Sequence, residues 1–356
     1  MAPVAAAAAI LVALVVPASK DPDAAPLDLP GLVLSSAAMA LLVFTIIEAP
    51  AYGWGAGRSL AGFAASAVLL AGFIVREREA AHPMLDVRLF RNLRFSAASG
   101  AVTASFFTLF GFIFLITQYM QFVRGYGPLS TGVRLLPVAL SVGAGSVAGT
   151  ALAVRAGTKL IVTTGLLAMV VFYGWVAATT SLSLSYGVIA GQMVVYGLGM
   201  GLSSAPATEA IMGAIPRSMA GVGSAVNDTT RLVGGTLGVA VIGSVYASVY
   251  GSRLTATLPA GVPGQVAALA RQSVGAAYTA AGTVAAHGHP ALGQALQLAS
   301  TNAFLRGLTI GALVAGGVAA AGALLAAAFL PAQPAQPVQP AAAAPAAEAA
   351  SPDPVM

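Results

Sequence analysis

The side chains best suited to chemistry in this sequence are a few polar residues that border very apolar runs. Asp228 and Arg231 lie three residues apart, so on a helix they share one face and can form an ion pair, with the Asn227 amide beside them. Charged groups at the ends of apolar spans are costly unless they are paired or hydrated. The pair therefore predicts either a gate or translocation-path contact, or an interfacial pair that marks where a span begins.

Glu209, Gln118 and Gln121 are the other polar candidates next to apolar runs. Glu209 fits a proton-coupling carboxylate at the mouth of a helix bundle, or a solvated acid at a helix end. Buried amides require hydrogen-bond partners, so the two glutamines either line a substrate cavity or form structural hydrogen bonds. No nucleophile–base set, phosphate-binding loop or metal-ligand spacing stands out. We therefore expect no enzyme activity, no metal site and no organic cofactor.

Long apolar segments must position these residues. The clearest is 232–250, which contains no charge, and a helix needs about 20 residues to cross about 30 Å of hydrocarbon. The remaining predicted spans are 31–47, 60–75, 95–122, 133–154, 160–178, 186–202 and 304–330. Together with a partial span at 1–16, these runs predict an all-α integral membrane protein with eight full transmembrane helices.

The composition excludes several other classes of protein. Hydrophobic residues make up 58% of the chain and charged residues 8%, whereas soluble domains carry about 25% charged residues. Lys and Arg are scattered at span ends instead of forming one basic face, so no nucleic-acid partner is expected. The sequence contains no cysteine, which excludes disulfides and thiolate metal sites.

Basic residues are distributed unequally between the two ends of the predicted spans. Nine Lys and Arg fall on one side, against three on the other, or six when the long segment 251–303 is included. The positive-inside rule predicts that the side with nine faces the cytoplasm. The cytoplasmic side then holds the linker 17–30, the loop 76–94, the turn 155–159, the segment 210–220 and the C-terminus. Segment 251–303 becomes an extracytoplasmic loop, and 331–356, rich in Pro and Ala, is a predicted disordered tail.

Glycine pairs four residues apart recur within the predicted spans. They occur at 145 and 149, 197 and 201, 234 and 238, and 307 and 311. This spacing lets helix backbones approach closely. We interpret the pairs as packing surfaces, which can also serve as rocking surfaces in alternating access.

Several short strings together resemble one family of membrane proteins. They are 117–121 (TQYMQ), 125–128 (GYGP), 135–137 (LLP), 82–86 (HPMLD), and 220–225 (AGVGSA) with Thr230 and Arg231. These resemble the fourteen-span drug:proton antiporters of the EmrB/QacA type in the major facilitator superfamily. The resemblance runs from about residue 3 to residue 330.

The resemblance implies a major-facilitator-type bundle with two linker spans at 31–75 and a six-helix C-terminal bundle at 95–330. The family's first five spans have no counterpart in the sequence. The implied function is efflux of small amphipathic compounds across the cytoplasmic membrane, with the proton as coupling ion. The implied partners are a small-molecule substrate, the lipid bilayer and a missing N-terminal bundle. The alternative is a truncated, non-transporting fragment, or a half-transporter that needs that bundle.

The segment 149–159 resembles a degenerate second copy of the family's cytoplasmic signature loop. It contains Gly149, Arg155, Gly157 and Lys159, but apolar residues occupy its usual acidic position. The resemblance therefore gives little support to a charge-relay role here. The alternative is a basic turn that anchors the protein on the cytoplasmic side.

Overall fold

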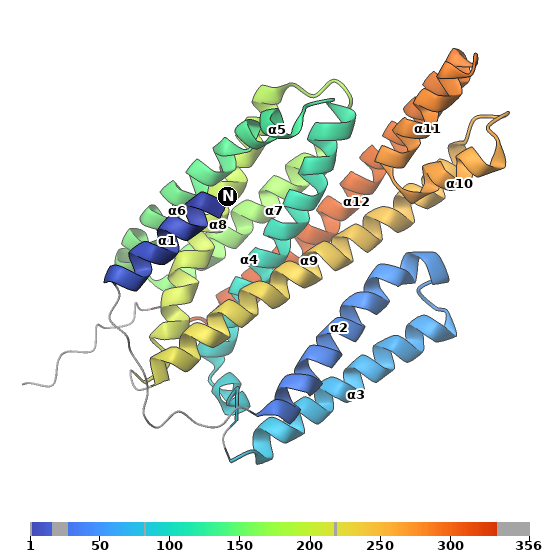
Figure 1. Cartoon of the computed structure of the whole chain (residues 1–356). Helices are drawn as coiled ribbons and strands as arrows, with labels where there is room; N and C mark the ends of the chain where they lie inside the picture. The colour runs from blue at the N-terminus through green and yellow to red at the C-terminus, as the bar shows by residue number, and fades with distance from the viewer. Residues whose placement is uncertain (1, 16–27, 82, 217–218, 333–356) are drawn as a thin grey trace, which may run out of the picture.

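The computed structural model describes residues 2–15, 28–81, 83–216 and 219–332, and all regular structure in these ranges is helical (Figure 1). Eight of the described helical segments are long and apolar enough to cross a membrane. They are formed by α2 (Leu29–Tyr52), α3 (Gly57–Glu79), α4 (Leu93–Gln118), α6 (Leu136–Ala156), α7 (Thr158–Thr179), α8 (Tyr186–Met212), α9 (Ala220–Thr257) and α12 (Pro290–Phe329). The prediction of an all-α membrane protein with eight full spans is confirmed.

The helices extend beyond the apolar runs that predicted them. Helix α9 begins at Ala220, twelve residues before the uncharged run that starts at Leu232. Helix α3 continues through Arg76 and Arg78, which were predicted to lie in a loop. Segment 251–303 is also mostly helical, because α9 and α12 enter it from either side and two shorter helices lie between them. Hydropathy marks only the part of a helix inside the hydrocarbon, whereas backbone hydrogen bonding continues into the headgroup region.

Shorter helices connect the spans. A π-helical turn, η2 (Tyr119–Val123), continues α4, and α5 (Pro128–Arg134) leads into α6. A 3-10 turn, η1 (Val87–Arg91), precedes α4. Helices α10 (Gly264–Gln272) and α11 (Val274–Ala286) lie between α9 and α12. Residues 17–27 of the predicted linker 17–30 and residues 333–356 of the predicted tail 331–356 lie outside the described residues. The end of the predicted linker is helical, because α2 begins at Leu29.

Glycine contacts hold the six-helix bundle together. A Cβ atom built on Gly145 of α6 would lie 2.7 Å from the Leu198 carbonyl of α8. Gly234 and Gly238 of α9 face the backbone carbonyls of Thr103 and Phe107 on α4 in the same way. The interpretation of these pairs as packing surfaces is confirmed, and close packing of α9 on α4 fixes the faces that these two helices present.

Helices α2 and α3 form a hairpin beside α9 (Figure 1). The Ser244 hydroxyl of α9 donates to the Ile46 carbonyl at 2.6 Å, and the Trp54 indole donates to the Ser248 hydroxyl at 3.2 Å. Few residues of α3 are buried. The two predicted linker spans are therefore a hairpin attached to one flank of the bundle.

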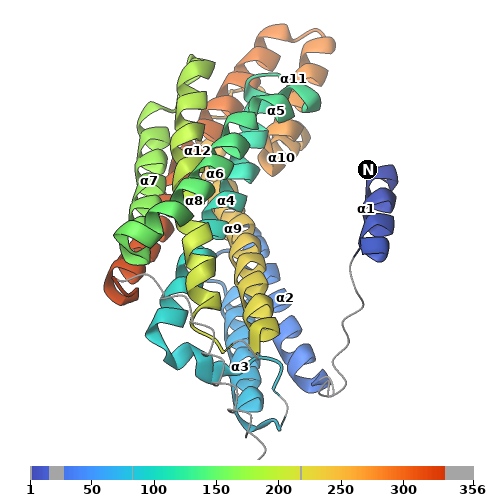
Figure 2. The same ribbon diagram turned by 90° about the vertical axis from the view of Figure 1, so that its left-hand side faces the viewer.

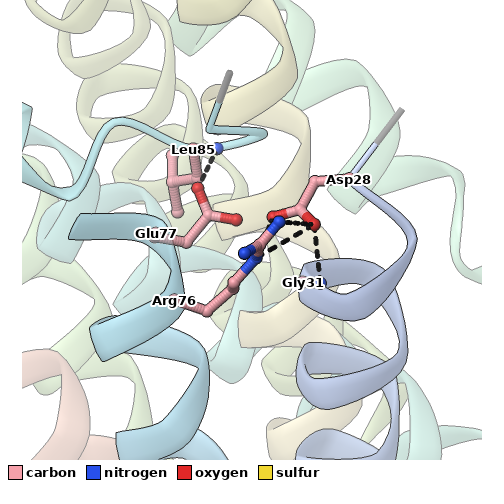
Figure 3. Close-up of polar contacts among 5 residues, drawn as sticks. All are labelled: Asp28, Gly31, Arg76, Glu77 and Leu85. Carbon is pink, nitrogen blue, oxygen red and sulfur yellow. Dashed lines mark hydrogen bonds and ion pairs between the residues drawn. The ribbon is translucent and has the colours of Figure 1, made fainter. Parts of the chain in front are cut away.

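A polar cluster joins the hairpin to the segment before α4 (Figure 3). Asp28 caps α2, accepts from the Gly31 amide, and pairs with Arg76 of α3 at 3.1 Å. The hydrogen bond from Arg76 lowers the pKa of Asp28, and burial opposes this effect. Glu77 is only 3% exposed and accepts from the Leu85 amide at 2.8 Å. The cluster fixes where the chain passes from the hairpin into the bundle.

Helix α1 (Ala2–Val15), the predicted partial span, stands apart from the other helices in Figure 2. Residues 5–15 are all exposed in the structure. Its 14 residues are too few to cross a bilayer as a straight helix. It contributes nothing to the sites described below.

Candidate functional site

Helix α9 forms a groove together with α4. Because Gly234 and Gly238 bring the two backbones together, Phe106 and Phe110 of α4 project beside the neighbouring face of α9. The groove has a volume of about 620 Å³, which falls in the usual range for small-molecule sites. Its lining is mostly apolar and comprises Phe106, Phe110, Asp228, Arg231, Leu232, Gly235, Thr236 and Val239.

Arg231 is held at one end of the groove by three helices. Its guanidinium donates to the Thr208 hydroxyl of α8 at 3.1 Å and lies 5.2 Å from the centre of the Phe106 ring. Thr208 in turn donates to the Asn227 side-chain oxygen at 3.1 Å. Asp228 lies 4.0 Å from Arg231 on the same helix. The hydroxyl is therefore the nearer polar partner of Arg231.

The pairing of Asp228 with Arg231 is looser than a pair shielded from water. The Asp228 side chain is 65% exposed and that of Arg231 is 36% exposed. Asn227, which is 5% exposed, occupies the buried face of α9. Exposed ion pairs contribute about 0–1 kcal/mol. The structure thus brings together three predicted residues, with the amide buried and the carboxylate open to the groove.

The other polar candidates lie away from this groove. Glu209 is exposed on α8, and its side chain has no ion pair or hydrogen bond with any described residue. Gln118 donates to the Phe114 carbonyl of its own helix at 3.4 Å. Gln121 is half-buried in η2, at the far end of α4 from Arg231. None of the three lines the groove.

The signature-like loop has mainly structural contacts. Gly149 packs on α8, since a Cβ atom there would lie 3.0 Å from the Leu202 Cα. Gly157 has φ +90° at the turn between α6 and α7, where its backbone also meets that of Ala332. Arg155 is exposed and Lys159 is half-buried. Gly149 is therefore required by the close approach of α8, and Gly157 by the turn between α6 and α7.

An aromatic cluster in the bundle core was not predicted from the sequence. The Tyr173 hydroxyl donates to the Thr108 carbonyl at 2.6 Å, and the Tyr196 hydroxyl lies 3.3 Å from that of Thr108. The Phe112 ring stacks on Tyr196 at 5.0 Å between centroids, beside an apolar cavity of about 50 Å³. A cavity of this volume is too small for a drug-sized compound. The residues come from three helices, so no local signal in the sequence shows that they meet.

Comparisons with known proteins agree on one class of relatives. No protein-family model matches the chain. It is 31% identical to the tetracenomycin C resistance and export protein of Streptomyces glaucescens, over 90% of this chain and 60% of that protein. It is 33% identical to the multidrug efflux pump LfrA of Mycolicibacterium smegmatis, over 76% of this chain and 53% of the pump.

The methyl viologen resistance protein SmvA of Salmonella typhimurium is 34% identical, over 67% of this chain and 47% of that protein. The chain thus spans about half the length of the curated relatives it matches. The eight apolar helices among the described residues indicate a membrane setting for this chain. The similarities identify the chain as a multi-pass membrane homologue of proteins named for drug resistance and export.

Proposed function

We propose that the chain acts in the efflux of small amphipathic compounds as part of a major facilitator transporter of the fourteen-span EmrB/QacA type. The observation that carries this proposal is the similarity to export proteins over most of the chain. The arrangement of a hairpin followed by six spans agrees with the two linker spans and C-terminal bundle of that family. The proposed transport activity belongs to the whole transporter, to which these spans contribute.

The α4–α9 groove is the proposed surface for the transported compound. Phe106, Phe110 and Val239 offer an apolar face, and Asp228 and Arg231 place both charges at one end of it. An amphipathic compound can therefore lay its apolar part on the rings while its polar group meets Asp228 or Arg231. The exposed carboxylate of Asp228 is the proposed group for proton exchange, because it reaches the groove without a tight partner.

A second helical bundle is proposed to face the groove. Leu232, Thr236 and Val239 are exposed along this side of α9 in the described structure. In alternating access, one bundle rocks against another around a site between them. We therefore expect the chain without such a bundle to bind compounds but not to transport them.

The proposed orientation places the beginning of α9 and the C-terminus in the cytoplasm of the cell membrane. It is supported by the excess of Lys and Arg at that end. The absence of cysteine allows single cysteines to be used as labels. In intact cells, Ala156→Cys should be shielded from an impermeant thiol reagent and Thr283→Cys should react. The opposite labelling pattern would reverse the orientation.

Accumulation of dyes in cells tests the transport proposal. The reading frame with its natural upstream sequence would be expressed in a bacterial host that lacks its own drug pumps. Cells should accumulate less of at least one aromatic dye than control cells, and a protonophore should remove the difference. A difference that survives the protonophore would contradict proton coupling. Equal accumulation of every dye in a broad panel would contradict efflux.

A further inference from the structure

A second pocket of ligand size lies at the opposite end of α9. Arg253 of α9 lies 25 residues after Asp228, which corresponds to about 37 Å along a helix. Arg253 and Arg306 of α12 line one pocket with a volume of about 700 Å³. The other lining residues are Thr180, Thr257, Ala299, Asn302, Leu305 and Thr309. No carboxylate lines this pocket.

These two arginines differ from the others at the same end of the bundle. Arg124 donates to a backbone carbonyl at 2.8 Å, Arg134 lies 4.0 Å above a tyrosine ring, and Arg271 donates to a threonine hydroxyl at 3.1 Å. Arg253 and Arg306 make no side-chain hydrogen bond, ion pair or ring contact with any residue that the structure describes. Their donors are therefore available to a ligand.

The bundle offers no carboxylate of its own to balance them. Between residues 95 and 330 the only acids in the sequence are Glu209 and Asp228, and both lie towards the opposite end of the molecule. In the proposed orientation this end of the bundle faces away from the cytoplasm. The positive-inside rule therefore does not explain its arginines. Two guanidinium groups facing one pocket favour an anion, because their forked donors match carboxylate and phosphate oxygens.

The depth of the pocket indicates an amphipathic ligand. Arg306 lies 24 residues before Leu330, or about 36 Å along a helix, so it reaches the headgroup level when α12 crosses the hydrocarbon. Thr180 lines both this pocket and the apolar cavity of the bundle core. Ala299 and Leu305 add apolar surface.

We propose that Arg253 and Arg306 bind the acidic group of an amphipathic anion at the membrane surface. The acidic group is a carboxylate, a sulfonate or a phosphate, which accepts hydrogen bonds from both guanidinium groups and from Asn302. The apolar part of the ligand lies against Leu305 and the neighbouring hydrocarbon. The same chemistry is offered by an anionic phospholipid and by an exported acid, and the experiment separates these sources.

Energy transfer from tryptophan to a dansyl group measures this binding without requiring transport. The purified full chain would be titrated with dansyl-aminoundecanoic acid and with its neutral methyl ester, which differ only in the acidic group. We expect saturable binding of the acid, with an affinity at least about tenfold above that of the ester. Arg253→Gln and Arg306→Gln should each remove most of this difference. Arg155→Gln, which changes an exposed arginine at the other end of the bundle, should leave it intact.

Competition identifies the source of the anion. Displacement of the dansyl acid by phosphatidylglycerol, but not by phosphatidylcholine, would support the site and assign it to a lipid. Retention of the acid in excess phosphatidylglycerol would support the site and assign it to non-lipid acids. Equal affinity for acid and ester would overturn the inference, as would a preference that persists in both glutamine variants. Transport could still occur in either of these cases, so the proposed efflux function would stand.

Discussion

Arg231 and Arg253 lie on the same helix but have different surroundings. Arg231, near the beginning of α9, has a threonine hydroxyl at 3.1 Å, an aromatic ring and a carboxylate around it. Arg253, near the end of α9, has no such partner among the described residues. A charged residue that already has partners on neighbouring helices stabilises the arrangement of those helices. One that has no such partner is available to a ligand.

The two pockets differ in the same way as the arginines. The groove at Arg231 is lined mainly by two phenylalanines and aliphatic residues, and it contains both signs of charge. The pocket at Arg253 is lined by hydroxyls, an amide and two positive charges. The comparison shows that the position of a charge at a span end does not determine its role. Its partners on the neighbouring helices do.

The largest expected effect comes from separating α9 from α4. In Gly238→Leu, the new side chain would overlap the Phe107 carbonyl, so the backbones must move apart and the groove is lost. We expect little or no folded protein by size-exclusion chromatography in detergent. Gly221→Ala is the matched control, because a Cβ atom there meets nothing within 4 Å. Normal folding of Gly238→Leu would show that the groove does not depend on this contact.

A smaller effect is expected at Arg231, which has partners on two neighbouring helices. Arg231→Ala removes a hydrogen bond and a cation–π contact, at a cost of about 1–2 kcal/mol. Asp228→Ala removes only a loose pair, at a cost of about 0–1 kcal/mol. Unfolding in denaturant should therefore show that Arg231→Ala is less stable than Asp228→Ala. The double variant should lose nearly the sum of the two single losses in free energy of unfolding. Equal losses and a double variant no worse than either single one would instead show a tightly coupled pair.

The Asp28–Arg76 pair provides a second comparison with Arg231, because its contribution to stability should be constant near neutral pH and lost only in acid. Arg76 lowers the pKa of Asp28 below its usual value of 3.8. A lowered folded-state pKa means that the pair stabilises the protein above pH 3.8 and loses this effect as the pH falls through the lower value. Asp28→Asn should therefore reduce the melting temperature equally at pH 8 and pH 6. A gap that changes between these two pH values would contradict this assignment.

The smallest effects are expected at the two glutamines. Gln118 bonds only to its own helix, and Gln121 has no side-chain hydrogen bond among the residues described. Gln118→Ala and Gln121→Ala should each change stability by less than about 0.5 kcal/mol. Both should also leave dye efflux unchanged. A loss of efflux with normal stability would place a substrate contact at the other end of α4, outside the groove.

Local signals in the sequence predicted much of the fold. Apolar runs located all eight spans, and glycine spacing predicted a packing surface at Gly234 and Gly238, which contacts α4 in the structure. Both signals depend on residues within a few turns of one helix. The same reasoning placed Asp228 and Arg231 on one helical face, which the structure confirms with a separation of 4.0 Å.

The partners of these residues could not be predicted in the same way. Thr208 and Phe106 meet Arg231 only because α8 and α4 pack against α9 in one register. Arg253 and Arg306 are more than fifty residues apart in the sequence, and hydropathy gives no sign that they share a pocket. Register between helices depends on the whole packing of the bundle. Local patterns within one segment of the sequence therefore do not specify this register.

Protection of a cysteine in the α4–α9 groove by a bound dye tests whether this groove is the substrate site. Thr236→Cys places a thiol in the wall of the groove, and Ala156→Cys places one at an exposed position outside it. Each variant would be made in the full reading frame and labelled with a maleimide, with and without a dye that the accumulation assay shows to be exported. A substrate in the groove should slow labelling of Thr236→Cys several-fold and leave Ala156→Cys unaffected. Equal labelling rates of Thr236→Cys with and without the dye would contradict the assignment of the α4–α9 groove as the substrate site.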